Sequence, residues 1–369
     1  MYVRQIIKFS NGNRQFYSEL KKRVDNYFKE NNLSKNGNTN MYLKTVFMIS
    51  CYVIPYFLFV FNVFDSKLVW WLLSVLMGMS MAGIGLCIMH DANHGSYSKN
   101  TRVNAILGFS LNLLGGHAMN WKLQHNVLHH TYTNVHNHDE DIAPPGFMRF
   151  EPHAKLKKIH RLQFLYAWFF YGIMSLMWST TKDFKQIIRY NKMKLLKGAN
   201  TTFAKELSII ILSKLIYFGY MIIPYLLIKE MTILNWITGF VTIHYIASFI
   251  LAAIFQPAHV VQETEFPVPS TEGNLENEWA IHQMKTTMNF GNRDKIFSWM
   301  VGGLNFQVEH HLFPTICHVH YPKISEIVKR TASEFNLPYH AKKSFAGALW
   351  SHEIMLWKLG RPTLQSVSA

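Results

Sequence analysis

Histidine is the residue type whose placement in this sequence suggests chemistry. The chain has 19 histidines, and none occurs in the first 89 residues. Three short groups stand out: His90-x-x-x-His94, His125-x-x-x-His129-His130 and Gln307-x-x-His310-His311. Neutral imidazole is a good ligand for iron, copper, zinc or nickel, and carboxylates are scarce in these groups. The residue types therefore indicate a transition-metal site.

The spacing of the histidines fits ligands carried on helices. Residues i and i+4 share one helix face, so His90 with His94, and His125 with His129, can each bind one metal centre. His130 is rotated away from that face and can reach a second centre. One isolated HxxxH match is a weak signal, because most such matches are ordinary structural histidines, whereas three groups together are far more specific.

The remaining histidines receive other predictions. His244 lies in the middle of an apolar run and is predicted to be a hydrogen-bonded intramembrane residue rather than a ligand. The acidic run 139–141 is either a solvated turn or an electrostatic partner of the nearby histidines. Supporting or surface roles are predicted for six histidines close to the groups: His117, His136, His138, His153, His318 and His320.

Long apolar runs must position these groups. A membrane-spanning helix needs about 20 apolar residues, and four runs reach that length: 45–64, 68–89, 207–228 and 233–255. The links within each pair are short, which predicts two helical hairpins. Two shorter runs, 103–119 and 163–180, are predicted to be interfacial or re-entrant. The predicted fold is an all-α integral membrane protein with four transmembrane helices and a His-rich cap.

The charge balance supports the same class of protein. Lys and Arg exceed Asp and Glu by 37 − 22 = 15, while 49% of the residues are hydrophobic. The basic residues flank the apolar runs, which favours a membrane over nucleic acid as the partner and excludes a simple soluble globule or a disordered chain. The basic segments 1–44 and 182–197 should be cytoplasmic, and no signal peptide is visible. The histidine groups and both termini are then expected on the cytoplasmic side of a multi-pass protein.

The histidine groups resemble those of the membrane fatty acid desaturase family. The resemblance rests on His90-Asp-Ala-Asn-His94, on His125-Asn-Val-Leu-His129-His130, and on Gln307-Val-Glu-His310-His311-Leu-Phe-Pro. Gln307 in place of histidine is typical of the front-end, linoleoyl-CoA-desaturase-like branch. Phe255-Gln-Pro-Ala-His259 and Trp279-x-x-His282-Gln283 support it, and the resemblance runs from about residue 40 to 340.

The resemblance implies a di-iron enzyme with two Fe ions and O2 as a co-substrate. Such an enzyme introduces a cis double bond into a long acyl chain, here of front-end type on an 18-carbon unsaturated chain. Motif matching assigns the iron ligands to His90, His94, His125, His129, His130, His259, His310 and His311. Gln307 and His282 are further ligand candidates, and Trp121, Gln124 and Asn126 are candidate contacts beside the second group.

The domain division and the partners follow from the same comparison. We expect a basic N-terminal segment (1–44), a desaturase domain (45–340) and a C-terminal tail (341–369). The substrate is expected to be an acyl-CoA or an acyl-lipid in the bilayer, with no nucleic acid involved. The sequence has no His-Pro-Gly-Gly haem motif, so the electrons are expected from a separate donor, either a ferredoxin or cytochrome b5 with a flavin reductase.

Three alternatives remain open from the sequence. The same iron site could serve a related histidine-box hydroxylase, a ketolase or a sphingolipid desaturase, which product analysis would distinguish. A bis-His haem bundle would place paired histidines within facing spans, but most histidines here lie just outside the apolar runs. A transporter would be expected to show two pseudo-repeated halves, which the sequence does not show.

Overall fold

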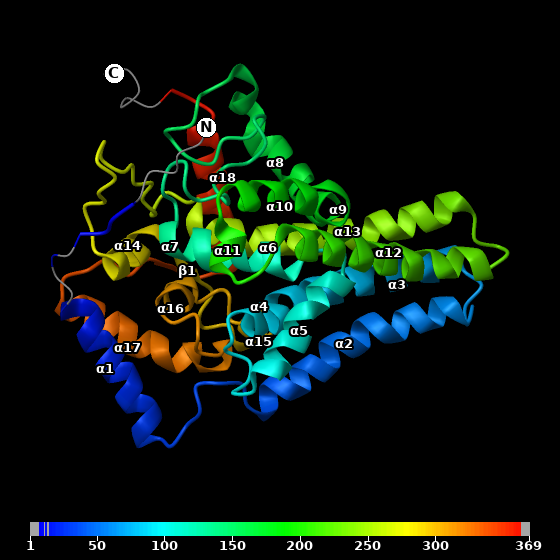
Figure 1. Ribbon diagram of the computed structural model, residues 1–369, viewed down its shortest axis with the longest axis horizontal. Coiled ribbons are helices and arrows are strands. Elements are labelled where there is room, and N and C mark those ends of the chain that lie inside the picture. The colour runs from blue at the N-terminus through cyan, green and yellow to red at the C-terminus, as the bar shows by residue number, and fades with distance from the viewer. Residues whose placement is uncertain (1–6, 11, 13–14, 363–369) are drawn as a thin grey trace. The chain divides into compact units, whose positions relative to one another are not determined.

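The structure is a computed structural model that describes residues 7–10, 12 and 15–362, and it is mostly helical (Figure 1). Its contacts divide the chain into two compact units, each treated separately here. Within the described residues, unit 1 is drawn from Met1–Gly37, Gln124–Ala167 and Ala253–Ala369. Unit 2 is drawn from Asn38–Leu123 and Trp168–Ala252. The chain therefore passes between the units several times.

Four long apolar helices dominate unit 2. They are α2 (Thr39–Val60), α3 (Lys67–Gly83), α12 (Phe203–Leu227) and α13 (Ile233–His259), whose last turns belong to unit 1. A π-helical segment, η1 (Ile84–Met89), and α4 (His90–Asn93) continue α3 without a break. In the described chain these four helices are long and apolar enough to cross a membrane. The four predicted runs are thus confirmed as long apolar helices.

The predicted limits of the first two helices were wrong by several residues. The first was predicted over 45–64, but α2 begins at Thr39, because the side chain of Asn38 accepts a hydrogen bond from Met41 N and caps the helix. The same helix ends at Val60, next to Asn62, whose φ is 46°. The second was predicted to end at residue 89, but its helix continues to Asn93 and so carries His90.

The two shorter apolar runs form short helices. Run 103–119 contains α5 (Thr101–Leu113) and the start of α6 (Ala118–Lys122). Run 163–180 contains α8 (Gln163–Tyr171), α9 (Met174–Met177) and the start of the π-helical η4 (Trp178–Lys182). Neither run belongs to the four helices long enough to span. Unit 2 continues with α10 (Asp183–Lys192) and α11 (Leu195–Gly198).

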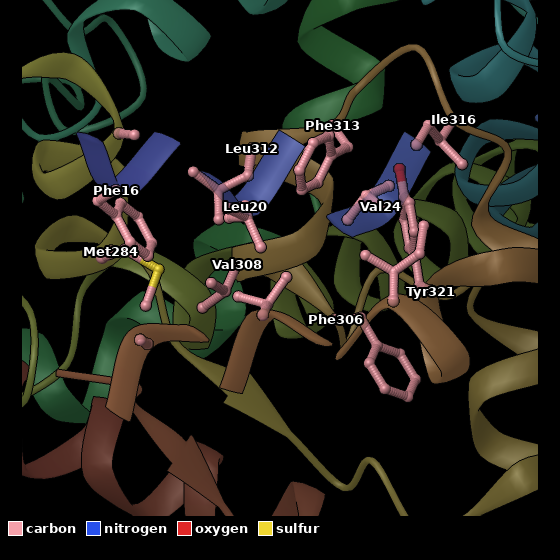
Figure 2. Packing of buried hydrophobic residues seen from close by; sticks show 14 of the residues in the cluster. Phe16, Leu20, Val24, Met284, Phe306, Val308, Leu312, Phe313, Ile316 and Tyr321 are labelled. Carbon is pink, nitrogen blue, oxygen red and sulfur yellow. The ribbon is translucent and has the colours of Figure 1, made fainter. Parts of the chain in front are cut away.

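Unit 1 has a hydrophobic core of its own. Helix α1 (Gln15–Glu30) packs against α17 (Tyr321–Glu334) through one face, with Phe16, Leu20 and Val24 fully buried (Figure 2). The core also receives side chains from α14 (Trp279–Thr286) and α16 (Gln307–Leu312), the helix of the third histidine group. Burial of apolar surface contributes about 25 cal/mol per Å² to the free energy of folding. This core therefore stabilises the position of α16 and of the histidines that it carries.

The rest of unit 1 departs from the all-α prediction. Strand β1 (Asn289–Phe290) pairs in parallel with β2 (Ala341–Lys342). A strand of two residues is too short to produce an alternating sequence pattern, so the sequence could not predict it. The segment predicted as a C-terminal tail contains α18 (Phe345–Leu359). The remaining elements of the unit are short: η2 (Leu123–His129), α7 (His130–Tyr132), η3 (Lys158–Leu162), α15 (Lys295–Met300) and η5 (His318–His320).

Candidate metal centre

A π-helical turn arranges the second histidine group in unit 1. His125 and His129 lie in η2, and His130 begins α7. A π-helical turn is wider than an α-helical one and brings residue i close to i+5. The rings of His125 and His130 have centroids 4.7 Å apart, against 5.3 Å for His125 and His129. The π-helical turn therefore adds an i, i+5 contact to the predicted i, i+4 pairing, since the ligand atoms of His125 and His129 still lie within 4.8 Å of each other.

Three histidines form one group through their Nε2 atoms. His130 Nε2 lies 3.2 Å from His125 Nε2 and 2.9 Å from His310 Nε2. All three side chains are buried, and they come from η2, α7 and α16. Ring nitrogens of residues 180 positions apart in the sequence thus converge.

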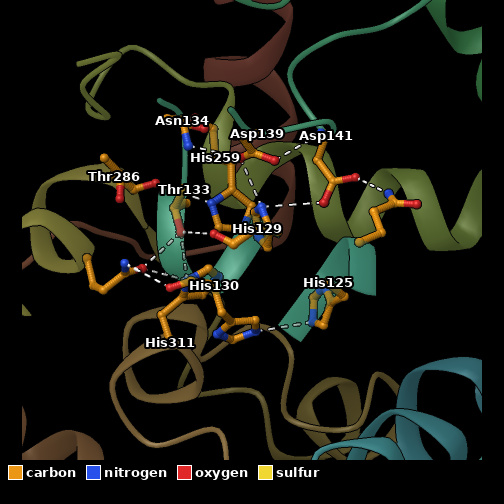
Figure 3. A network of polar contacts seen from close by, with 12 residues as sticks. His125, His129, His130, Thr133, Asn134, Asp139, Asp141, His259, Thr286 and His311 are labelled. Carbon is orange, nitrogen blue, oxygen red and sulfur yellow. Dashed lines mark hydrogen bonds and ion pairs between the residues drawn. The ribbon is translucent and has the colours of Figure 1, made fainter. Parts of the chain in front are cut away.

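A second group consists of His129, His259 and His311. Each of these residues offers one ligand atom, and the three atoms lie within 4.8 Å of one another. All three residues are buried, at 2% exposure or less. Figure 3 shows His129, from the second sequence group, beside His259 and His311. The predicted ligand outside the three sequence groups, His259, is therefore brought to them by the end of α13.

Hydrogen bonds at Nδ1 determine which ring nitrogen of each histidine in this second group can bind a metal. His129 Nδ1 donates to Asp139 Oδ2 at 3.0 Å, and His259 Nδ1 donates to Thr286 O at 3.2 Å. His311 Nδ1 donates to Gln283 Oε1 at 2.8 Å. A proton on each Nδ1 leaves Nε2 as a lone-pair donor, and outward hydrogen bonds of this kind are typical of metal-ligating histidines.

The Nε2 atoms of this group are available to bind a metal. Those of His129, His259 and His311 are buried and have no hydrogen-bond partner among the described residues. A buried polar atom left unpaired costs about 1–3 kcal/mol, so three together are unusual in a folded protein. A metal ion bound by the three lone pairs would satisfy them all. The residues present fit a metal centre.

Burial and neighbouring charges shift the pKa values of this group in different directions. Burial, and then the surrounding histidine rings, hold the pKa of His311 well below its usual range. Burial also opposes protonation of His129, but the carboxylates of Asp139 and Asp141 outweigh it and raise the pKa of His129. Burial would raise the pKa of Asp139, but His129 and two backbone N–H groups lower it overall. Asp139 therefore holds a negative charge against the outer edge of His129.

Helix α16 is fixed by a buried carboxyl on its other side. Glu309 accepts hydrogen bonds from Asn289 Nδ2 at 2.8 Å and from the Tyr339 hydroxyl at 2.9 Å. Burial raises the pKa of Glu309 to about 7. Asn289 Oδ1 also accepts from the backbone N–H of Val308 at 2.9 Å. These bonds orient the helix that carries His310 and His311.

The two further ligand candidates have different surroundings. Gln307 is fully buried; its Nε2 donates to Leu304 O at 2.8 Å, while its Oε1 has no partner among the described residues. His282 is also buried with Nε2 unpartnered, but it lines a separate polar cavity with His153, Glu265 and Glu276. His282 belongs to none of the potential metal-ligand groups found in the described chain.

The first histidine group lies in unit 2. His90 and His94 have ring centroids 4.7 Å apart, as expected for an i, i+4 pair on one helix. Trp121 packs against both rings, at 5.5 and 5.6 Å. The other two predicted contacts lie in unit 1, where Gln124 donates a hydrogen bond to Asp141 and Asn126 is half-buried in η2.

The other histidines mostly have structural partners. His244 accepts a hydrogen bond from the Tyr217 hydroxyl at 2.7 Å and lies 2.9 Å from Ser175 Oγ, which confirms that it is hydrogen-bonded within an apolar helix. His117 lies 3.2 Å from Glu206, and His136 lies 2.7 Å from Glu151. Asp139 is 2% exposed, so the electrostatic-partner interpretation of the acidic run is confirmed.

Sequence reasoning missed several supporting residues. Thr133 donates to His129 O at 2.7 Å, and its Oγ1 is 2.9 Å from Gln283 Oε1. Gln283 and Thr286 stand in the motif around His282, so their types were a usable signal. Tyr339 gave no such signal, because its contact with Glu309 joins residues 30 positions apart that share no sequence pattern.

Comparison with known proteins identifies the group to which this chain belongs. Residues 65–343 match the family model described as fatty acid desaturase. The chain belongs to the fatty acid desaturase family. It is therefore an oxidoreductase of a membrane-bound family, in agreement with its four long apolar helices. The resemblance inferred from the histidine groups is confirmed.

Its relatives carry names that agree with the front-end branch. The sn-1 linoleoyl-lipid 6-desaturase of Synechocystis sp. is 34% identical over 98% of this chain and 99% of its own length. The protein of the same name from Arthrospira platensis is 33% identical over 93% of this chain and 92% of its own length. The acyl-lipid (8-3)-desaturase of Physcomitrium patens is 36% identical over 94% of this chain and 72% of its own length.

Proposed function

We propose that this desaturase introduces a cis double bond at carbon 6 of a linoleoyl chain in a membrane glycerolipid. The substrate is suggested by the Synechocystis and Arthrospira relatives, whose full lengths are almost covered by this chain. A lipid-bound acyl chain is preferred to acyl-CoA because these relatives are named linoleoyl-lipid desaturases. The linoleoyl chain also agrees with the 18-carbon unsaturated substrate expected from the sequence.

The observation that carries the proposal is the set of three unpartnered Nε2 atoms. His129, His259 and His311 hold these atoms within 4.8 Å of one another, with each Nδ1 tied outward. Eight histidines are proposed to hold two Fe ions: His90, His94, His125, His129, His130, His259, His310 and His311. His90 and His94 are assigned on the family motif alone.

The protein residues have positioning and electrostatic roles in this proposal. Bound iron supplies the activation of O2 and the oxidising power needed to remove hydrogen from an unactivated methylene. Asp139, Gln283 and the carbonyl of Thr286 fix the ring orientations, so the Nε2 atoms need not reorganise when metal binds. Burial keeps competing water away from the ligand nitrogens.

We further propose a topology and an electron source for this enzyme. The four long helices span the bilayer, and the histidine groups and both termini face the cytoplasm, since segments 1–44 and 182–197 are rich in Lys and Arg. A separate carrier, either a ferredoxin or cytochrome b5 with a flavin reductase, delivers the electrons. Reporter fusions after residues 64 and 231 should report the outside, and a fusion after residue 195 the cytoplasm; the reverse pattern would reject this orientation.

Lipid analysis of a heterologous host tests the reaction. Cells expressing the wild type or His129→Ala, and supplied with oleate or linoleate, are analysed by gas chromatography–mass spectrometry with double-bond localisation. The proposal expects a new carbon-6 double bond in the glycerolipid fraction with the wild type alone. A double bond elsewhere would reject the regiochemistry, and a hydroxylated product would move the enzyme to the hydroxylase class. Purified protein without iron would reject the metal assignment.

A further inference from the structure

Unit 2 has an open cavity whose lining contains none of its histidines. Its volume is about 270 Å³, and its walls come from α2, α3, α12 and α13 near the two short links that join these helices in pairs. Three indole rings line it: Trp70, Trp71 and Trp236. Ligand pockets usually measure roughly 300–1,000 Å³, so this cavity has room for part of one lipid chain but not for a large ligand.

Two polar groups in the wall indicate what such a ligand must carry. Lys67 is the one charged residue among those that line the cavity, and it is exposed to solvent. Asn235 Nδ2 is buried and has no hydrogen-bond partner in the part of the chain that the structure describes. An unpaired buried amide is costly unless a ligand supplies an acceptor. The lining therefore suits an apolar chain that bears an acceptor oxygen and a negative charge.

The cavity lies at the opposite end of α3 from the first histidine group. Ser74, in the cavity wall, precedes His90 by 16 residues along one continuous helix, which is roughly 24 Å along its axis. Between Ser74 and His90, α3 is in close contact with α13, since a Cβ at Gly78 would come within 2.7 Å of Ile243 O. With these helices spanning a hydrocarbon core of about 30 Å, the cavity lies in the leaflet away from His90.

We propose that this cavity binds part of one acyl chain of an anionic glycerolipid from the leaflet opposite His90 and His94. Asn235 Nδ2 donates to an ester carbonyl, and Lys67 pairs with the anionic headgroup. Trp70 and Trp71 lie near the start of α3, where indoles favour the membrane–water interface and the level of the ester groups. The inference rests on the proposed spanning of the helices and not on the proposed reaction.

The acyl chain of the substrate is a poorer occupant of the cavity. An acyl chain covers about one leaflet, half of the roughly 30 Å hydrocarbon core. A chain held for reaction beside His90 would therefore end before Ser74, and Gly78 and Ile243 close the direct path between α3 and α13. The methyl end of a fatty acid also carries no oxygen that could accept a hydrogen bond from Asn235 Nδ2.

Lipid binding to the full-length protein tests the proposal. The delipidated protein in mild detergent is titrated with dioleoyl phosphatidylglycerol, dioleoyl phosphatidylcholine or oleate and analysed by native mass spectrometry. Wild type should bind one phosphatidylglycerol about fivefold more tightly than phosphatidylcholine, the effect of one lysine near an anionic headgroup. Lys67→Gln should remove this preference, and Asn235→Leu should weaken both phospholipids by about fivefold.

A matched variant separates the cavity from general surface charge. Lys229 is an exposed lysine in the link before α13 and does not line the cavity, so Lys229→Gln should leave all affinities unchanged. Equal binding of the two phospholipids by wild type, equal effects of Lys67→Gln and Lys229→Gln, or oleate binding in place of phospholipid would each overturn the proposal. The assay needs no turnover, so a protein that binds phosphatidylglycerol but makes no desaturated product contradicts the proposed reaction alone.

Discussion

Buried histidines in the two units differ in what their ring nitrogens contact. In unit 2, His244 is 1% exposed, with Tyr217 at one ring nitrogen and Ser175 at the other. In unit 1, His129 is fully buried and has Asp139 at Nδ1, but its Nε2 has no partner among the described residues. Both are polar side chains that burial penalises, so the number of satisfied nitrogens, and not burial, separates them.

An open nitrogen marks a candidate metal ligand only where it converges with others, since His282 also has an unpartnered Nε2 but belongs to no potential metal-ligand group of the described residues. His244 requires no metal or ligand, because Tyr217 and Ser175 satisfy both of its ring nitrogens. His129, His259 and His311 each keep one nitrogen for a group that the protein does not supply. Substitutions around His244 should therefore change stability, and substitutions of His129, His259 or His311 should change iron content and activity.

The largest effect is expected from His129→Ala. Removing one Nε2 from the group of three should abolish detectable product and lower the iron bound per protein, because the remaining pair is an incomplete ligand set. Iron is measured by inductively coupled plasma mass spectrometry and product by gas chromatography. The matched variant His244→Gln should keep its iron and lower only the melting temperature. Equal iron loss in both variants would remove the distinction between the two sites.

Lys214→Ala should give the largest loss of stability. Lys214 Nζ lies 2.9 Å from Asp183 Oδ2 and donates to the carbonyls of Gly115 and Trp178. Leaving Asp183 buried without its cation should cost about 3–5 kcal/mol. Thermal unfolding in detergent would measure it, and the double variant with Asp183→Ala should recover part of the loss. A double variant no more stable than Lys214→Ala would show that the pair is not coupled.

Asp139→Asn should have a smaller effect, which should appear as weaker iron binding. The substitution removes the charge that faces His129 Nδ1 and should weaken iron binding about 10–100-fold. Competition with a chelator measures this affinity. Asp141→Asn is the matched change, because Asp141 lies farther from His129 Nδ1, at 3.4 Å, and should have a weaker effect. The opposite order would show that Asp139 is not the group that orients His129.

Much of this comparison was predictable from the sequence. The spacing of the three histidine groups marked the candidate metal site, and the placement of His244 within an apolar run marked it as a separate case. The four long helices followed from run length and lack of charge. These features are local in the sequence, so composition and periodicity are enough to reveal them.

The remaining features depend on contacts between distant residues or on local backbone changes. The π-helical turn at 123–129 adds an i, i+5 contact to the predicted i, i+4 pairing, and no residue in that segment signals it. Asp139 could be read as a solvated turn until its contact with His129 was known. Glu309, held by Asn289 and Tyr339, depends on three segments that meet only in the folded chain. Tertiary contacts of this kind have no signature in one sequence.

The smallest effect is expected from Tyr217→Phe, which isolates one bond of the satisfied site. The change removes the hydroxyl that donates to His244 Nε2 and leaves that nitrogen without its donor. Hydrogen bonds between membrane helices contribute about 0.6 kcal/mol on average and up to about 1.7 kcal/mol, so the melting temperature should fall slightly while iron content stays constant. Tyr225→Phe, on the same helix, removes a hydroxyl with no hydrogen bond to the described residues and should change neither quantity. A fall in iron with Tyr217→Phe alone would mean that the His244 network is coupled to the metal site. The satisfied and the open histidines would then be parts of one system, and counting unsatisfied nitrogens would no longer separate structure from function in this protein.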